Sequence, residues 1–246
     1  MADQSFADIV ARLRRNIRHD DPPQDDGLRA SSEYVLEWET VAAVNLLRHG
    51  HAVLVASTDM ERDLDPILTT LAIGVEKLLK VSLGHTELAQ KNGWPAKAAM
   101  RAAGHDSVEL QRQVLDYVRT AAIGKPFEAD ALRLVAAVDS DDVWMMLLLV
   151  LSHYGKSGRF HYLDDLAGEK GLVPGSGPRG SWMMLTVAAM FKNPLADAND
   201  EDPLRQANLR RSASLIDWWS AIAALAETGA LGERAVEFGR VIYPTK

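Results

Sequence analysis

The spacing of the apolar residues is the strongest constraint on the fold of this chain. Between positions 64 and 79 they recur at steps of mostly three and four residues, at Leu64, Ile67, Leu68, Leu71, Val75, Leu78 and Leu79. A helical spacing also joins Val108, Leu115, Val118 and Ala122. Such steps place side chains on one face of an α-helix, whereas a half-buried strand alternates with a period of two. The spacing predicts long amphipathic helices.

The amino-acid composition also predicts helices. The chain has 34 alanines and 31 leucines among its 246 residues. Alanine and leucine lose little conformational freedom in a helix, whereas strands favour branched and aromatic side chains. The sequence therefore predicts an all-α protein. The absence of cysteine removes disulfides, zinc–thiolate centres and thiol catalysis from consideration, and it fits a reducing compartment.

Charge and hydropathy limit the partners and the compartment that we expect for this chain. The net charge is −7, so contact with nucleic acid requires a local basic patch rather than bulk attraction. The longest strongly apolar run, residues 143–151, has nine residues, far short of the roughly 20 that cross a bilayer. The N-terminus lacks the apolar core of a signal peptide. We expect a cytoplasmic protein with no membrane partner.

Three polar breaks containing proline divide the chain, at residues 20–27, 172–180 and 193–203. Residues 1–26 combine a short amphipathic basic helix with an acidic linker. We expect this arm to dock on its own domain or on a sister subunit, or else to contact nucleic acid or an acidic partner. Residues 27–171 should form the main helical bundle. Residues 172–246 should supply a linker and C-terminal helices that pack on it, including an amphipathic helix near residues 208–227.

The segment GHDSVEL, residues 104–110, marks the start of a helix. Gly104 is suited to end the preceding short helix, and Asp106 to cap the next one. Glu109, three residues after Asp106, should reach back to complete a capping box. A cap does not require the histidine at position 105, so His105 is left for another role.

The helix before this segment carries Glu76 and Lys80, four residues apart at the edge of its apolar stripe. A short connection brings His105 back toward that helix, and apolar neighbours should draw Arg159 onto the same bundle. Burying charges singly is costly, so these groups should pair. We expect Glu76 to accept hydrogen bonds from Lys80, His105 or Arg159.

The glutamate–lysine helix, the GHD segment and the later GRFHYLDDL stretch, residues 158–166, together resemble the HEPN superfamily over about residues 32–168. The resemblance implies an up-and-down helical bundle that forms a homodimer. In catalytic branches it implies metal-independent RNA cleavage by an arginine and a histidine four to six residues apart, without a cofactor. It also implies an RNA- or nucleotide-linked role in prokaryotic or phage stress or defence.

The chemistry explains that pairing, because arginine neutralises the phosphate and histidine moves the proton of the attacking 2′-hydroxyl. The candidate catalytic residues are Arg159, His161 and His105, and the candidate binding or structural cluster is Glu76, Lys80 and Asp106. Arg159 and His161 are two positions apart, so on a helix they point about 200° apart. Arg14 and His19 have the family spacing, but they lie in the N-terminal arm.

Two other functions stay open at this point. One is a non-catalytic oligomerisation or regulatory protein that keeps the bundle. The other is a metal-dependent phosphohydrolase of the HD type, in which a histidine, a His–Asp doublet and a distant aspartate bind a divalent cation. Its candidate ligands are His49, His51 or His85, then His105 and Asp106, then Asp139, Asp142 or Asp164.

Overall fold

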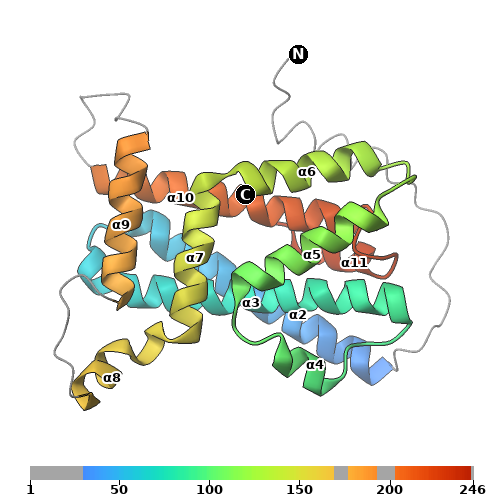
Figure 1. Ribbon diagram of the computed structural model, residues 1–246, viewed down its shortest axis with the longest axis horizontal. Helices are drawn as coiled ribbons and strands as arrows, with labels where there is room; N and C mark the ends of the chain where they lie inside the picture. The colour runs from blue at the N-terminus through green and yellow to red at the C-terminus, as the bar shows by residue number, and fades with distance from the viewer. Residues whose placement is uncertain (1–29, 169–176, 193–202, 245–246) are drawn as a thin grey trace.

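The computed structural model describes residues 30–168, 177–192 and 203–244, and these form helices with no strand among them (Figure 1). The all-α prediction is confirmed for this part of the chain. The elements are α2 (Ala30–Ala56), α3 (Met60–Lys91), α4 (Lys97–Ala102), α5 (Ser107–Ala121), α6 (Glu128–Ser140), α7 (Asp142–Lys156), the 3-10 turn η1 (Gly158–Phe160), α8 (His161–Ala167), α9 (Gly177–Lys192), α10 (Pro203–Glu227) and α11 (Ala235–Ile242). None of the described helices is long and apolar enough to cross a membrane.

One predicted feature lies outside the described residues, and another is partly wrong. The predicted arm, residues 1–26 with Arg14 and His19, lies outside the described residues. The predicted break at 172–180 is partly wrong, because α9 begins at Gly177. Pro178 follows at the start of this helix, where proline is tolerated because the first turn has no hydrogen-bond acceptor for its missing N–H. A proline that suggested a loop thus belongs to a helix start.

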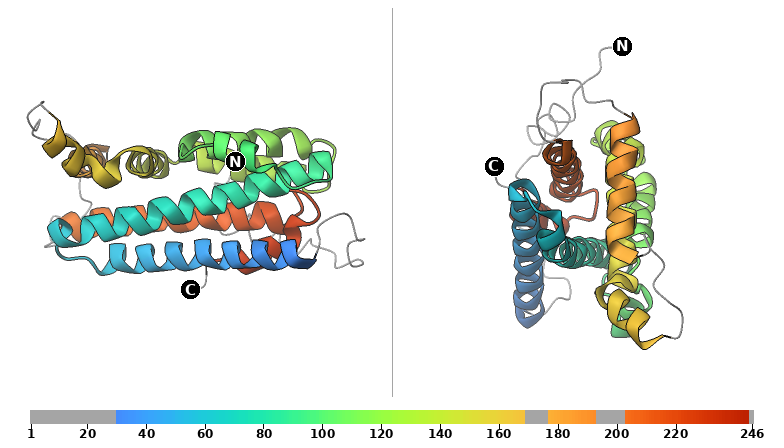
Figure 2. Two further views of the ribbon diagram at one scale, coloured as in Figure 1. Left: turned by 90° about the horizontal axis from the view of Figure 1, so that it is seen from below. Right: turned by 90° about the vertical axis from the view of Figure 1, so that its left-hand side faces the viewer.

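The helices form layers (Figure 2). Helix α2 lies on one outer side and packs along α3. Helices α3 and α10 form the middle of the molecule, and α5, α6 and α7 cover their other side. The short α11 returns along α10 and also contacts α2. Helix α3 is therefore covered by α2 from one side and by α5 and α7 from the other.

Aspartate side chains fix where three of the long helices begin. Asp59 accepts hydrogen bonds from the backbone N–H groups of residues 61 and 62 at the start of α3, at 3.0 and 3.3 Å. Asp141 does the same for residues 143 and 144 of α7, and Asp106 for residue 109 of α5. Gly104 has φ of +63° just after α4 ends. The predicted cap at Asp106 and helix end at Gly104 are both confirmed.

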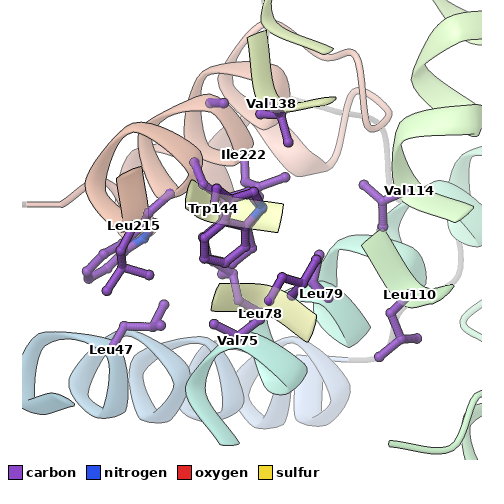
Figure 3. Packing of buried hydrophobic residues seen from close by; sticks show 14 of the residues in the cluster. Leu47, Val75, Leu78, Leu79, Leu110, Val114, Val138, Trp144, Leu215 and Ile222 are labelled. Carbon is purple, nitrogen blue, oxygen red and sulfur yellow. The ribbon is translucent and has the colours of Figure 1, made fainter. Parts of the chain in front are cut away.

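The core is centred on Trp144 of α7 (Figure 3). Its ring stacks on Trp218 of α10, with ring centroids 4.2 Å apart and an angle of 17° between the planes. Its indole N–H donates to the side-chain oxygen of Gln111 on α5 at 2.8 Å. Side chains of α3, α5, α6 and α10 surround it. The C-terminal helix α10 thus shares one hydrophobic core with the helices that precede it.

Helices α10 and α11 approach closely at Gly239. A Cβ atom at this position would lie 2.4 Å from the backbone nitrogen of Glu227 and 2.7 Å from the backbone oxygen of Ala223. Backbone atoms of a packed helix cannot move aside without disturbing its hydrogen bonds, so only glycine fits here.

We predict that Gly239→Ala lowers the free energy of unfolding by about 1–3 kcal/mol, the usual cost of overpacking a core. Urea denaturation followed by circular dichroism measures the change. The matched control is Gly93→Ala, where the nearest atom to a new Cβ is 4.0 Å away. Equal stability of the two variants would contradict the close contact.

Candidate functional site

A cluster of polar side chains lies where α3, the start of α5 and the end of α7 meet. At its centre is Glu76 of α3, whose side chain is 12% exposed. One carboxylate oxygen, Oε1, accepts from Lys80 Nζ at 2.9 Å and pairs with His105 Nδ1 at 2.9 Å. The structure therefore brings Glu76, Lys80 and His105 together as expected, with Glu76 as the shared acceptor.

The backbone of α7 lies against this group at Gly155. A Cβ atom there would be 3.7 Å from the backbone oxygen of His105 and 4.0 Å from Oε2 of Glu76. The glycine keeps this contact free of a side chain. It also places the last turn of α7 directly beside His105.

Asp106 extends the cluster onto α7. Its Oδ1 accepts from the backbone N–H of Glu109 at 3.2 Å and from the hydroxyl of Ser152 at 3.0 Å, and its Oδ2 pairs with Lys156. The lysine, followed by these hydrogen bonds, holds the pKa of Asp106 below its usual value. Ser152 and Lys156 were not predicted, although their spacing of four residues places both on one face of α7.

The predicted capping box is only half present. The carboxylate of Glu109 binds the guanidinium of Arg112 and the amide of Gln113 instead of reaching back along the chain. Arg112, with help from Gln113, lowers the pKa of Glu109 to about 2. The guanidinium of Arg112 is a charged, bidentate donor one helical turn after Glu109. It binds the carboxylate more strongly than the single backbone N–H of Asp106 would.

His105 combines exposure with a fixed orientation. Its side chain is 59% exposed, while its partner Glu76 is largely buried. A carboxylate can only accept hydrogen bonds, so Nδ1 of His105 donates, and in the neutral form of the ring Nε2 then carries a free lone pair. Within the described part of the chain, Nε2 has no hydrogen bond. A histidine held this way can take up a proton at Nε2 from a bound molecule.

Arg159 and His161 lie away from this cluster. Arg159 is near Tyr154, where burial raises the pKa of the phenol and the charge of Arg159 opposes that rise. The Tyr154 hydroxyl lies 2.8 Å from the hydroxyl of Thr69 on α3. Thr69 precedes Glu76 by two helical turns, which is about 10 Å along the helix. The ring of His161 packs on Gly177 of α9, where a Cβ atom would come within 2.1 Å of it. Arg159 is therefore not a donor to Glu76.

The candidate ligands of a metal-dependent phosphohydrolase are dispersed. His85 is 4% exposed and packs between Trp94 and Phe238, with ring centroids 5.8 and 4.9 Å away. His51 pairs with Ser212 at 2.7 Å, and Asp139 pairs with Arg119. No three histidine or carboxylate side chains of the described residues are grouped so as to hold a metal ion. The predicted ligand set is not assembled.

Comparisons with known proteins give no identification. No family model matches the chain, and no curated protein or solved structure matches it either. The function must therefore be inferred from the geometry around Glu76, His105 and Asp106.

The two roles of Asp106 can be separated by substitution. Asp106→Ala removes the cap of α5 and should lower the free energy of unfolding by about 1 kcal/mol. Asp106→Asn keeps an oxygen for the backbone N–H and for Ser152 but loses the charge that faces Lys156, so it should cost less. Urea denaturation of both variants measures the two decreases in the free energy of unfolding. Equal decreases would mean that Asp106 stabilises the fold through its ion pair with Lys156 and not through the cap.

Burial of His85 should make stability depend on pH. Desolvation lowers the pKa of His85 from 6.5 to about 4 in the folded chain. Above pH 6.5 the ring is neutral in both states and contributes nothing. Between pH 6.5 and 4 the unfolded chain takes up a proton that the folded chain does not, so unfolding becomes easier by up to about 3 kcal/mol.

The measurement is the free energy of unfolding of the native chain and of His85→Leu between pH 7.5 and pH 4. We expect the native chain to lose more stability over this range than the variant. Parallel curves would contradict the shift in pKa.

Proposed function

We propose that this chain is a HEPN-like helical module that acts on RNA in a prokaryotic or phage stress or defence setting. In this proposal it is a metal-independent endoribonuclease, and His105 is the group that moves the proton. The observation that supports it best is the pairing of the exposed His105 with the largely buried Glu76. The Glu76 carboxylate fixes the tautomer and stabilises the imidazolium that forms during proton uptake.

The reaction follows from the free lone pair on Nε2. His105 accepts the proton of a ribose 2′-hydroxyl as the 2′-oxygen bonds to the adjacent phosphorus. The bond from phosphorus to the 5′-oxygen of the next nucleotide breaks, and that oxygen takes a proton from water. The products are a 2′,3′-cyclic phosphate and a 5′-hydroxyl end, and His105 returns its proton to solvent.

Two lysines stand beside the histidine and supply positive charge for the phosphate. Lys156 is 46% exposed and pairs with Asp106, whereas Lys80 is 21% exposed and pairs with Glu76. Lys156 is therefore the more accessible of the two to a substrate. The whole chain carries a charge of −7 and each lysine faces one carboxylate, so RNA binding requires Lys156 to exchange Asp106 for a phosphate.

Arg159 and His161, the pair suggested by the resemblance, have no part in this mechanism. Their separation from Glu76 leaves His105 as the candidate that has both an orienting partner and an open side. The alternative, a non-catalytic role, keeps the same cluster as a structural clamp between α3, α5 and α7.

The experiment incubates single-stranded RNA with the purified chain in excess chelator and analyses the ends of the products. We expect cyclic phosphate ends, and a 10²- to 10⁴-fold loss of rate in His105→Ala, as is usual when a general base is removed. Glu76→Gln should retain the fold and lose part of the rate, because the amide cannot stabilise an imidazolium.

The matched control is His153→Ala, which removes an exposed histidine in the last turn of α7. It should leave the rate unchanged. Cleavage that survives in His105→Ala would overturn the assignment of the proton-transfer group. An inactive native chain would support the non-catalytic alternative.

A further inference from the structure

Helix α4 (Lys97–Ala102) has six residues, and none of them is buried. It lies at the edge of the molecule, in the connection that leads from α3 to His105 (Figure 1). A helix that buries no side chain gains little hydrophobic stabilisation. Its side chains are therefore available to contact another molecule.

Two apolar residues outside the helix hold α4 in place. Trp94 precedes α4, and its ring fills the space beside Gly84 of α3, where a Cβ atom would come within 2.2 Å of the ring. Ala103 follows α4 and packs against the hydrophobic core. The connection is thus attached to the bundle on both sides of α4, which leaves the helix itself on the surface.

The exposed surface of α4 is basic. Lys97 and Arg101, which we call the α4 pair, are four residues apart, so they lie on one face of the helix, about 6 Å apart along its axis. Both are exposed, and neither side chain has a hydrogen bond or an ion pair within the described part of the chain. Residues 88–105 contain no aspartate or glutamate. In a chain with a net charge of −7, this is the kind of local basic patch that contact with nucleic acid requires.

The cations of the two neighbouring helices differ from the α4 pair, because each of them has a carboxylate partner. This holds for every lysine and arginine of α3 and α5, namely Arg62, Lys77, Lys80, Lys91, Arg112 and Arg119. A paired cation must give up its carboxylate before it binds a phosphate. The α4 pair can bind phosphates without such a loss.

We propose that Lys97 and Arg101 bind phosphates of a single-stranded RNA beside the nucleotide whose 2′-hydroxyl gives its proton to His105. This inference rests on the proposed function, because it takes RNA as the substrate. Arg101 lies within one turn of His105, since its backbone oxygen accepts a hydrogen bond from the N–H of Gly104 at 3.0 Å. Lys97 lies one helical turn farther from the histidine. A strand that runs along α4 therefore reaches His105 with part of its backbone charge neutralised.

Lys156 approaches the same histidine from α7, because its neighbour Gly155 lies beside the backbone oxygen of His105. The structure thus supplies cations from two elements, with Lys156 for the reacting phosphate and the α4 pair for the phosphates next to it. Contacts to phosphates position a strand but do not distinguish its bases. We therefore expect the α4 pair to strengthen binding to RNA of any sequence.

The first experiment measures the affinity of the full chain for a fluorescein-labelled single-stranded 2′-O-methyl RNA, which cannot be cut, over a range of salt concentrations. The double variant Lys97→Gln/Arg101→Gln should bind more weakly than the native chain. Its slope of log K against log salt should be smaller by about 1.4, because each phosphate contact on a single strand contributes about 0.7.

The matched control is Arg48→Gln/Lys125→Gln, which removes two exposed cations, one on α2 and one in the turn after α5. It changes the net charge equally and should bind like the native chain. Equal affinities of the two double variants, or no binding of this RNA by the native chain, would overturn the inference.

The second experiment separates this inference from the proposed function by measuring cleavage of unmodified RNA in excess chelator. Where both are correct, Lys97→Gln/Arg101→Gln raises KM and leaves kcat unchanged, because the α4 pair binds the substrate and the transition state equally. A native chain that binds RNA through the α4 pair without cutting it would refute the role of His105 and support the α4 pair. A chain that cuts RNA with the same KM in the double variant would refute the α4 pair and leave the proposed function in place.

Discussion

The arrangement of this protein depends on the burial of α3 between α2 on one side and α5 and α7 on the other. Apolar side chains along α3, such as Val75 and Leu79, are removed from water by this packing, which supplies the main stabilisation of the bundle. Glu76 lies between them, at the edge of the apolar stripe. A carboxylate there loses water and needs donors, which Lys80 and His105 provide. The position of the candidate site is thus a consequence of the core.

Much of this could be predicted from the sequence because the signals are local. The three- and four-residue steps determine the helical class, and the cap at Asp106 depends only on residues within one turn. The pairing of Glu76 with Lys80 follows from their spacing on one helix. His105 joins them across 29 residues, through a connection that contains α4, and the sequence indicates this contact only because a buried carboxylate needs donors.

The remainder depends on how distant helices align. Ser152 and Lys156 bind Asp106 across 46 and 50 residues, and nothing within one turn of either residue indicates which turn of α7 meets the start of α5. The hydrogen bond from the Trp144 indole to Gln111 joins α7 to α5, and the stacking of Trp144 on Trp218 joins α7 to a C-terminal helix expected to pack on the bundle. Of the three donors expected for Glu76, only Arg159 does not pair with it, for a similar reason. The chain leaves α7 through a 3-10 turn, which carries Arg159 toward Tyr154 and not toward Glu76.

The His105 cluster lies on the side of α3 that α5 and α7 cover, opposite to α2. Glu76 of α3 pairs with the His105 ring, and Gly155 of α7 lies beside the backbone oxygen of the same histidine. The Glu76 carboxylate is thus held between packed helices, while the ring that it orients stays 59% exposed. A structural role and a role in proton transfer would use this same contact, and they differ only in whether a bound molecule meets the open side of the ring.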